Sequence, residues 1–289
     1  MIIVPATGVL AGGSLALLST GPFDLSPCSD DFTGATLAAL WSNTSVNSGT
    51  VAPYPSLRLL RLDTGTTAAS AASLRTAATV TNIFARTTVA TRVLIGGTGT
   101  TTSLEIWRMQ LRVDANNLAT IRAIRTNGLR EIEATLTVDG IETARVRQPV
   151  GRAQLPGFPV SLSVLRFGSR VLLFNGATVV LDAEWIATAA TVDLAIGNDA
   201  TSTRVAADLV EYQRLPLVVF GSEPSINSAV VRGTSASVLV PSSTKTGAVD
   251  VTAYGCSTST TISGGYTYAV SDRDIRLNQD IERALYWLS

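Results

Sequence analysis

VSLSVLRFGSRVLLFNGATVVLD, residues 160–182, contains three short apolar runs that are separated by turn residues. Gly168 lies at the first turn and Asn175-Gly176 at the second. Asn-Gly pairs tolerate the positive φ angles that a two-residue hairpin turn requires. Short apolar runs bounded in this way predict antiparallel β-strands joined by tight turns.

The same pattern continues on the N-terminal side of this segment. Apolar residues alternate with polar ones over residues 107–113 and 132–138, which is the two-residue period of half-buried strands. Asn127-Gly128 and Asp139-Gly140 mark chain reversals between such runs. We therefore predict a meandering antiparallel β structure over about residues 57–215. The lack of a long helical period there argues against an α/β fold.

The composition excludes several classes of function. The 289 residues carry 22 basic and 22 acidic side chains, and charged residues make up only 15%. A neutral chain lacks the basic excess with which proteins bind nucleic acid or anionic membranes, so we predict neither as a partner. With no histidine and two cysteines, the chain cannot build a Ser-His-Asp triad, a histidine-held metal site or a four-cysteine zinc site. We predict no cofactor.

The N-terminal segment is apolar but does not have the pattern of an export signal. It lacks a basic first part, and Pro5, Gly12 and Gly13 interrupt the apolar run. No stretch of the sequence reaches the ~18 uninterrupted apolar residues of a membrane-spanning helix. We expect a protein that is made in the cytoplasm without a signal peptide.

A helical period occurs at the C-terminus, over residues 271–289. Ser271 and Asp274 suit the start of a helix, and apolar residues follow at the spacing of one helix face. Because a short isolated helix is marginal in water, we expect it to pack on its own chain or on a neighbouring subunit. The side chains that suit an interface are Leu285, Tyr286 and Trp287.

Four segments together resemble a known fold. They are DDFTG (30–34), the hairpin of 160–182, VDLAIGND (192–199) and AADLVEYQRL (206–215). These segments are similar to strands of the concanavalin-like jelly roll, which occurs in laminin-G domains, lectins and glucanases. The resemblance implies a jelly-roll sandwich over residues 28–216.

The C-terminal part resembles an IPT/TIG immunoglobulin-like domain. The segments that carry this resemblance are VVFGSEPS (218–225), SASVLVPSSTKTGAVDVTAYG (235–255) and GGYTY (264–268). The first two strands of that family are missing here, but VPATG (4–8) and GGSLALLSTGPF (12–23) match its opening pattern. The resemblance therefore implies an immunoglobulin-like sandwich that is split between residues 1–27 and 217–270, with the jelly roll inserted between its parts.

The two cysteines, Cys28 and Cys256, allow two interpretations. Considered alone, they are typical of two buried apolar thiols. The split-domain resemblance instead places them in loops at one end of the immunoglobulin-like sandwich. On that resemblance we expect a disulfide or a close pair.

The jelly-roll family includes laminarinase-type glycosidases, whose retaining sites carry the pattern Glu-x-Asp-x-x-Glu on one strand. The nearest match is EIEATL (131–136), in which leucine replaces the last carboxylate. Retaining hydrolysis needs two carboxyl groups ~5–5.5 Å apart. Glu131 follows a turn and Glu133 points away from the apolar face, so we expect both to be solvated. We therefore predict no catalytic residue and no enzyme.

Sugar binding without catalysis would use aromatic side chains in a groove. Tyr54, Trp41 and Trp185 are the candidates, although both tryptophans also suit a core, which is our interpretation of Trp107. Laminin-G-type domains often hold calcium at their rim, and the resemblance makes Asp182 and Asp199 candidates for ligands. Ordinary Asp and Asn turns explain these two residues equally well without a metal.

Both resembled domain types are usually extracellular binding or adhesion modules, whereas the chain carries no recognisable export signal. A virion protein, released by lysis, satisfies both observations. We therefore predict a non-enzymatic component of a bacteriophage tail, baseplate or capsid decoration. It would bind other virion proteins and copies of itself, and its jelly roll could bind a host-surface glycan. The alternative is a free or cell-surface carbohydrate-binding, lectin-like protein, and a glycoside hydrolase is the third class.

Overall fold

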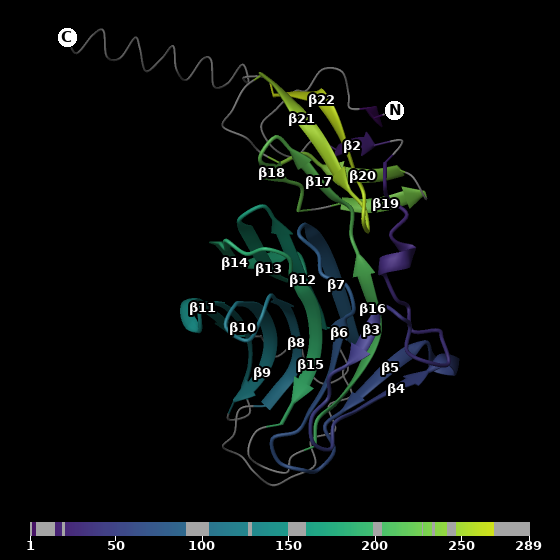
Figure 1. The fold of residues 1–289 in the computed structure, drawn as a ribbon, viewed down its shortest axis with the longest axis vertical. Helices are drawn as coiled ribbons and strands as arrows, with labels where there is room; N and C mark the ends of the chain where they lie inside the picture. The colour runs from purple at the N-terminus through teal and green to yellow at the C-terminus, as the bar shows by residue number, and fades with distance from the viewer. Residues whose placement is uncertain are drawn as a thin grey trace, which may run out of the picture. The chain divides into compact units, whose positions relative to one another are not determined.

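The computed structural model divides the chain into two compact units (Figure 1). The larger unit is Ser26–Arg214, and the smaller unit combines Met1–Leu25 with Leu215–Ser289. The structure describes residues 2–3, 15–18, 21–90, 104–126, 129–149, 160–198, 204–226, 228–232, 235–241 and 247–268.

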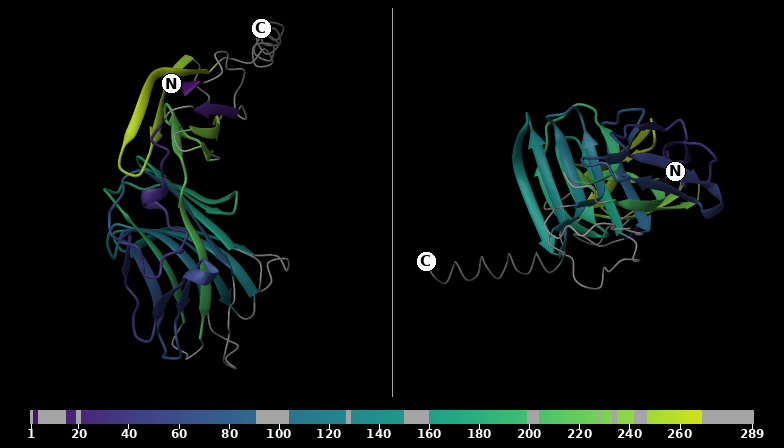
Figure 2. Two further views of the ribbon diagram at one scale, coloured as in Figure 1. Left: turned by 90° about the vertical axis from the view of Figure 1, so that its right-hand side faces the viewer. Right: turned by 90° about the horizontal axis from the view of Figure 1, so that it is seen from below.

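Two seven-stranded antiparallel sheets make up the larger unit, and they form the curved layers coloured from blue to green in Figures 1 and 2. Sheet 1 has the strand order β11-β10-β9-β8-β15-β6-β3. Its strands are β3 (Trp41–Asn43), β6 (Ala71–Thr76), β8 (Leu104–Arg112), β9 (Leu118–Thr126), β10 (Leu129–Val138), β11 (Ile141–Pro149) and β15 (Thr191–Gly197).

Sheet 2 has the strand order β14-β13-β12-β7-β16-β5-β4. Its strands are β4 (Thr50–Tyr54), β5 (Leu59–Asp63), β7 (Ile83–Ala90), β12 (Val160–Phe167), β13 (Arg170–Asn175), β14 (Thr178–Glu184) and β16 (Ala206–Arg214). Two short 3₁₀ turns, η1 (Ser26–Cys28) and η2 (Pro55–Leu57), lie outside the sheets. The three strands predicted from residues 160–182 are therefore neighbours in sheet 2.

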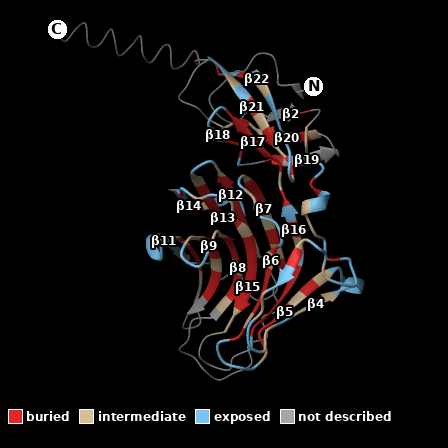
Figure 3. Ribbon diagram, viewed as in Figure 1, coloured by how far each residue is buried: buried red, intermediate tan, exposed pale blue. Residues whose placement is uncertain are grey.

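Alternating side chains fill the space between the two sheets. Trp107, Met109 and Leu111 of β8 are fully buried, and they share one core with Leu162 and Val164 of β12 in sheet 2. Figure 3 shows the buried residues in red along the strands of both sheets. The predicted two-residue period is confirmed. Apolar side chains at every second position are buried between the sheets, which removes them from water, and the side chains at the intervening positions face away from the core.

The turn between β10 and β11 has the conformation that its sequence predicts. Asp139 has a φ of 51° and Gly140 a φ of 79°, so both residues are left-handed, as a tight hairpin with the twist of the strands requires. Gly140 adopts this φ without a steric penalty. The predicted turn at Asn127-Gly128 lies outside the described residues.

The smaller unit contains two four-stranded antiparallel sheets, in the orders β1-β2-β20-β19 and β18-β17-β21-β22. The first sheet consists of β1 (Ile2–Ile3), β2 (Leu15–Leu18), β19 (Ser228–Arg232) and β20 (Ser235–Leu239). The second consists of β17 (Leu217–Phe220), β18 (Glu223–Pro224), β21 (Gly247–Tyr254) and β22 (Ser259–Tyr268).

Two separate segments of the chain form this smaller unit. Leu15 of β2 pairs with Leu239 of β20, and Leu18 pairs with Ala236, although the larger unit separates the two strands in sequence. The split-domain prediction requires this pairing. Leu18 and Val238 pack with Phe220 and Val251 from the second sheet of the unit, so both segments contribute to one core.

The prediction of an all-β chain with a jelly-roll-like sandwich of two antiparallel sheets is confirmed for the described residues. The immunoglobulin-like character of the smaller unit stays a prediction. The predicted helix of 271–289, with Leu285, Tyr286 and Trp287, lies outside the described residues. None of the helices in the described part of the chain has the length and apolar character needed to cross a membrane.

Candidate functional site

Charged side chains form cross-strand rows on the face of sheet 1 that points away from the core. In one row Arg108 of β8 is opposite Arg122 of β9, Arg122 is opposite Glu133 of β10, and Glu133 is opposite Arg147 of β11. Residues directly opposite each other on an antiparallel pair have close side chains, so opposite charges here attract. The strand register therefore builds an ionic network from residues far apart in the sequence.

Glu133 lies at the centre of this network and is fully buried. Its carboxylate accepts hydrogen bonds from Arg122 Nε at 2.8 Å and Arg147 Nε at 2.5 Å, and also from Arg122 Nη2. Burial by itself would raise the pKa of this carboxyl group, but the hydrogen bonds and positive charges of the two arginines outweigh it and hold the pKa below its usual value.

This position of Glu133 corrects one expectation. The alternation in β10 placed it correctly on the face away from the core, but the prediction that it would be solvated is wrong. Guanidinium groups from the strands on both sides cover the carboxylate, because Arg122 and Arg147 are long enough to lie across it. Glu131, two residues earlier, retains partial exposure and lies 3.9 Å from Arg147.

Glu105 joins the same face through an irregularity in β8. Strict alternation would place it on the core side with Trp107 and Met109, but the register of β8 against β9 shifts between Glu105 and Trp107. Such a β-bulge turns a side chain to the other face of the sheet. The Glu105 carboxylate consequently lies 3.4 Å from Arg122 Nη1 and 3.5 Å from Arg108 Nη1.

A pocket of ≈ 330 Å³ opens beside these three charged groups. Its polar lining consists of Ser70, Glu105, Arg108, Arg122 and Asn198, while small or apolar residues complete the wall: Ala69, Ala71, Ile124 and Gly197. A Cβ atom at Gly197 would lie 3.7 Å from Glu105 Oε1, so a side chain there would occupy pocket space.

Asn198 holds one wall of the pocket in place. Its Oδ1 accepts a hydrogen bond from the Ser70 backbone N–H at 2.6 Å, and its Nδ2 donates to the Thr67 carbonyl at 3.0 Å. The Asn198 N–H in turn donates to the Ser70 carbonyl at 3.0 Å. Three hydrogen bonds join Asn198, which follows β15, to the segment that precedes β6, and they make this a preformed site, as small-molecule pockets usually are.

Sequence reasoning missed this pocket and its residues. One signal was available: Glu105 is a charged residue at a position that the alternation of β8 assigns to the core. Such a conflict predicts either a bulge or an error in the strand assignment. The pairing of Arg108 with Arg122 and the contribution of residues 69–71 depend on strand order, which local patterns do not contain.

Neither of the two tryptophans predicted to bind sugar is at a surface. Trp41 is 6% exposed, donates from Nε1 to Asp30 Oδ2 at 2.9 Å, and packs edge-on against Tyr212. Trp185 is 1% exposed and lies under the guanidinium of Arg166. Both predictions are wrong, because burial in the core leaves no ring face on which a sugar could stack.

Tyr54, the third predicted sugar-binding residue, is 37% exposed at the end of edge strand β4. The guanidinium carbon of Arg61 lies 4.9 Å from the centre of its ring, and Arg61 is itself fixed by two hydrogen bonds to Asp208. One face of the ring is thus engaged by a cation. The structure does not place Tyr54 in the lining of the pocket.

The predicted calcium ligands do not form a site in the described residues. Both carboxylate oxygens of Asp182 accept hydrogen bonds from Arg170, at 2.9 and 2.7 Å, and this pairing lowers the pKa of Asp182. Asp199 lies outside the described residues. Within the described ranges, no three His, Cys, Asp or Glu side chains are grouped as a metal ion would need.

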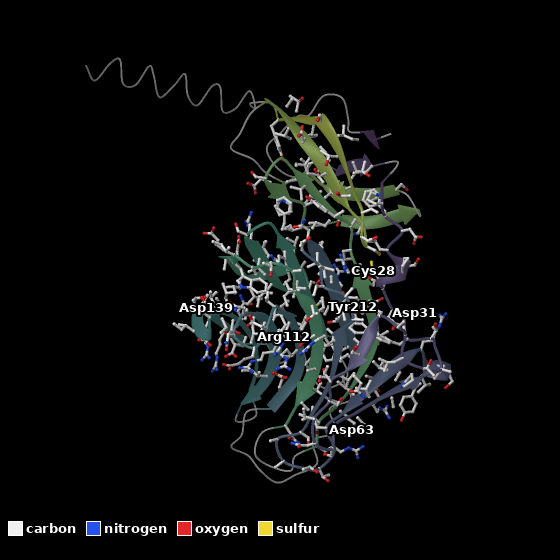
Figure 4. The ribbon with its side chains drawn as sticks, in the orientation of Figure 1. Cys28, Asp31, Asp63, Arg112, Asp139 and Tyr212 are labelled. Atoms are coloured by element: carbon white, nitrogen blue, oxygen red, sulfur yellow. The ribbon has the colours of Figure 1, made fainter. Side chains whose placement is uncertain are left out.

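The two cysteines of the chain are both disulfide-bonded, so Cys28 is joined to Cys256. The sequence left two interpretations open, a disulfide or two buried thiols. The structure contains the disulfide. Cys28 ends the 3₁₀ turn η1 and is labelled in Figure 4.

Comparison with models of protein families and with curated protein sequences finds no match. Among solved structures, the catalytic domain of an endo-1,3-beta-glucanase (laminarinase) from Thermotoga petrophila RKU-1 has a TM-score of 0.50 at 9% identity, covering 64% of this chain and 95% of that one. A Bacillus licheniformis beta-glucanase has a TM-score of 0.49 at 8% identity, covering 64% of this chain and 96% of that one. SCLam, a non-specific endo-beta-1,3(4)-glucanase from family GH16, has a TM-score of 0.47 at 14% identity, covering 73% of this chain and 97% of that one.

At such low identity, structural similarity shows the fold alone. The laminarinase comparison agrees with the two seven-stranded sheets described above. The comparisons give no support to the resemblance of the smaller unit to IPT/TIG domains or to an origin in a bacteriophage. The chain therefore contains a concanavalin-like jelly-roll sandwich, the fold also found in glucanases.

Proposed function

We propose that this protein is a lectin-like carbohydrate-binding protein, and that the sugar binds in the pocket on sheet 1. The observation that carries the proposal is the preformed polar pocket beside Glu105 and Arg108. Carboxylate and guanidinium groups accept from and donate to sugar hydroxyls, and a volume of ≈ 330 Å³ accommodates one or two sugar rings. Glucan, which the laminarinase is named for, is the first neutral polysaccharide to test.

The ionic network favours binding over hydrolysis. A retaining glycosidase needs a carboxylic acid whose pKa is raised, so that it remains protonated and can protonate the leaving group. Glu133 has the opposite property, because Arg122 and Arg147 hold its pKa below the usual value. The Glu105 carboxylate lies 3.5 Å from Arg108 and 3.4 Å from Arg122. These pairings support the prediction of a non-enzymatic protein.

The disulfide bears on where the protein acts. Disulfides form and persist in oxidising environments, such as the outside of cells and the surfaces of virions. The bond between Cys28 and Cys256 supports action outside the cytoplasm. Docking on a bacteriophage particle, with virion proteins and copies of this chain as partners, stays a prediction from the sequence. Mass spectrometry of purified particles would test it.

The carbohydrate proposal is tested by binding of the full chain to an array of neutral and acidic glycans. We expect the natural protein and Gly197→Ala to bind, because one methyl group leaves most of the pocket open. Gly197→Val should abolish binding, because the larger side chain fills the pocket beside Glu105. Absence of binding to every glycan, or unchanged binding by Gly197→Val, would overturn the proposal.

The same preparation tests the alternative of an enzyme. Incubation with laminarin, lichenan and xyloglucan should release no reducing sugar. Release that disappears in Glu105→Gln or Glu133→Gln would show that the protein is a hydrolase. Glu142→Gln is the matched control, since Glu142 neither lines the pocket nor belongs to the 131–136 segment.

A further inference from the structure

Arg108 has unused hydrogen-bonding capacity at the pocket. Arg122, the other arginine there, donates to Glu133 through Nε and Nη2 and contacts Glu105 through Nη1. Arg108 approaches Glu105 at 3.5 Å through Nη1, and its buried Nε has no hydrogen-bond partner in the described part of the chain. Because an arginine carries five N–H donors in a planar fork, Arg108 retains donors for a ligand.

The next row of sheet 1 lacks this property. There Arg75 donates to both carboxylate oxygens of Asp193, each at 2.9 Å, and Gln110 donates to Thr120 at 2.7 Å. These polar groups satisfy one another and need no ligand. The spare donors of Arg108 therefore lie where the pocket is, and not in the neighbouring row of the same face.

Among the described residues that line the pocket, positive charges are in excess. Arg108 and Arg122 contribute two positive charges against the one negative charge of Glu105. Glu133 lies next to Arg122, but it does not line the pocket and Arg147 also balances it. An anionic group entering the pocket would accept a charge-assisted hydrogen bond from a guanidinium, which is stronger than a bond between neutral groups.

We propose that the pocket binds an acidic sugar residue, whose carboxylate or sulfate accepts hydrogen bonds from Arg108 while Glu105 accepts one from a sugar hydroxyl. This inference rests on the proposed carbohydrate-binding function and names its ligand class. The planar fork of arginine matches the oxygen spacing of both anions, which is why the two share this chemistry. The anion adds to the hydroxyl contacts and selects acidic over neutral sugars.

The test is isothermal titration calorimetry of the full-length protein with four ligands. Trigalacturonate carries the carboxylate, its methyl ester is the same sugar without the charge, and a chondroitin sulfate tetrasaccharide supplies sulfate together with carboxylate. Neutral laminaritriose is the fourth ligand. We expect the natural protein to bind trigalacturonate at least about tenfold more tightly than its methyl ester, since a hydrogen bond to a charged group is lost.

Two arginine variants separate this site from general charge attraction. Arg108→Gln should weaken trigalacturonate binding about tenfold or more and should weaken binding of the methyl ester less, so that the preference for the acid over its ester is lost. Arg112→Gln removes the same charge from the same strand outside the pocket lining, and should bind as the natural protein does. Arg112 is labelled in Figure 4. Circular dichroism checks that both variants are folded.

Each outcome decides a different claim. Equal losses in Arg108→Gln and Arg112→Gln, or equal affinity for trigalacturonate and its ester, would overturn the acidic-sugar inference. Tight binding of laminaritriose alone, abolished by Gly197→Val, would overturn it while keeping the carbohydrate proposal. Binding of the chondroitin probe but not trigalacturonate, with the same dependence on Arg108, would support the inference and identify sulfate as the anion. Failure of every sugar to bind would reject the carbohydrate proposal itself.

Discussion

At the scale of single residues, Glu133 shows how a charge is kept in a buried position. The carboxylate is fully buried, yet two arginines from opposite neighbouring strands donate to it. Removing one partner from a buried ion pair is costly, because the other charges remain without compensation. The local sequence predicted the face on which Glu133 lies. It could not predict burial, since Arg122 and Arg147 come from strands whose order only the fold defines.

We expect Glu133→Gln to lower the free energy of unfolding by about 3 kcal/mol, at the lower end for a broken buried pair because both arginines are partly exposed. Glu142→Gln is the matched control on the same sheet. Glu142 and Arg145 are both largely exposed and pair at 2.6 Å, so its loss should cost no more than about 1 kcal/mol. Urea denaturation followed by fluorescence measures both, and equal losses would contradict this account.

Acid should reduce the contribution of Glu133. Its pKa is lower in the folded protein than in the unfolded chain, so the unfolded state takes up the proton first and folding is favoured above the unfolded pKa of about 4.3. That stabilisation is lost as the pH falls toward the folded pKa. The difference in unfolding free energy between the natural protein and Glu133→Gln should therefore be constant near pH 7 and shrink below about pH 4.5. The same difference at pH 3 and pH 7 would show that the carboxylate is not stabilised in this way.

At the scale of elements, the strands follow from the sequence but the irregularities do not. The alternation over 107–113 predicts which side chains of β8 face the core, because its period is local. The bulge at Glu105 reverses that pattern at one end of the strand and creates one wall of the pocket. Trp41 and Trp185 show the same limit, since the opposite sheet decides whether an aromatic side chain is covered. Patterning thus predicted the antiparallel strands, the resemblance to a known fold predicted the sandwich, and the site depended on departures from the pattern.

Gly49, before β4, provides a test of close packing between segments. A Cβ atom there would lie 1.9 Å from the Ala71 carbonyl oxygen and 2.5 Å from its carbon, both of which are backbone atoms. We expect Gly49→Ala to cost at least about 2 kcal/mol, because β6 must move to admit the methyl group. Gly197→Ala is the control, with ordinary contacts of 3.7 Å and longer. Thermal unfolding should separate the two variants, and similar melting temperatures would refute the close approach.

At the scale of the whole molecule, the smaller unit is built from the two ends of the chain, and the larger unit lies between them in the sequence. β2 is complete before the larger unit begins, but it pairs with β20, which is made after the larger unit ends. Folding of the smaller unit must therefore wait for most of the chain, and it closes a long loop at an entropic cost. The sequence suggested this arrangement through a family pattern divided between its two ends. No local periodicity could have indicated it.

The disulfide between Cys28 and Cys256 closes a loop of similar length, so it should stabilise the folded chain by restricting the unfolded one. We expect Cys28→Ser, Cys256→Ser and the double variant each to lower the stability by about 2–4 kcal/mol, because any of them removes the same bond. Calorimetry with and without a reducing agent measures this, and the reducing agent should affect the natural protein alone. Thiol titration of the unreduced, unfolded chain should find no free thiol. Additive losses in the double variant would mean that the two sulfurs act separately and that the loop is not closed.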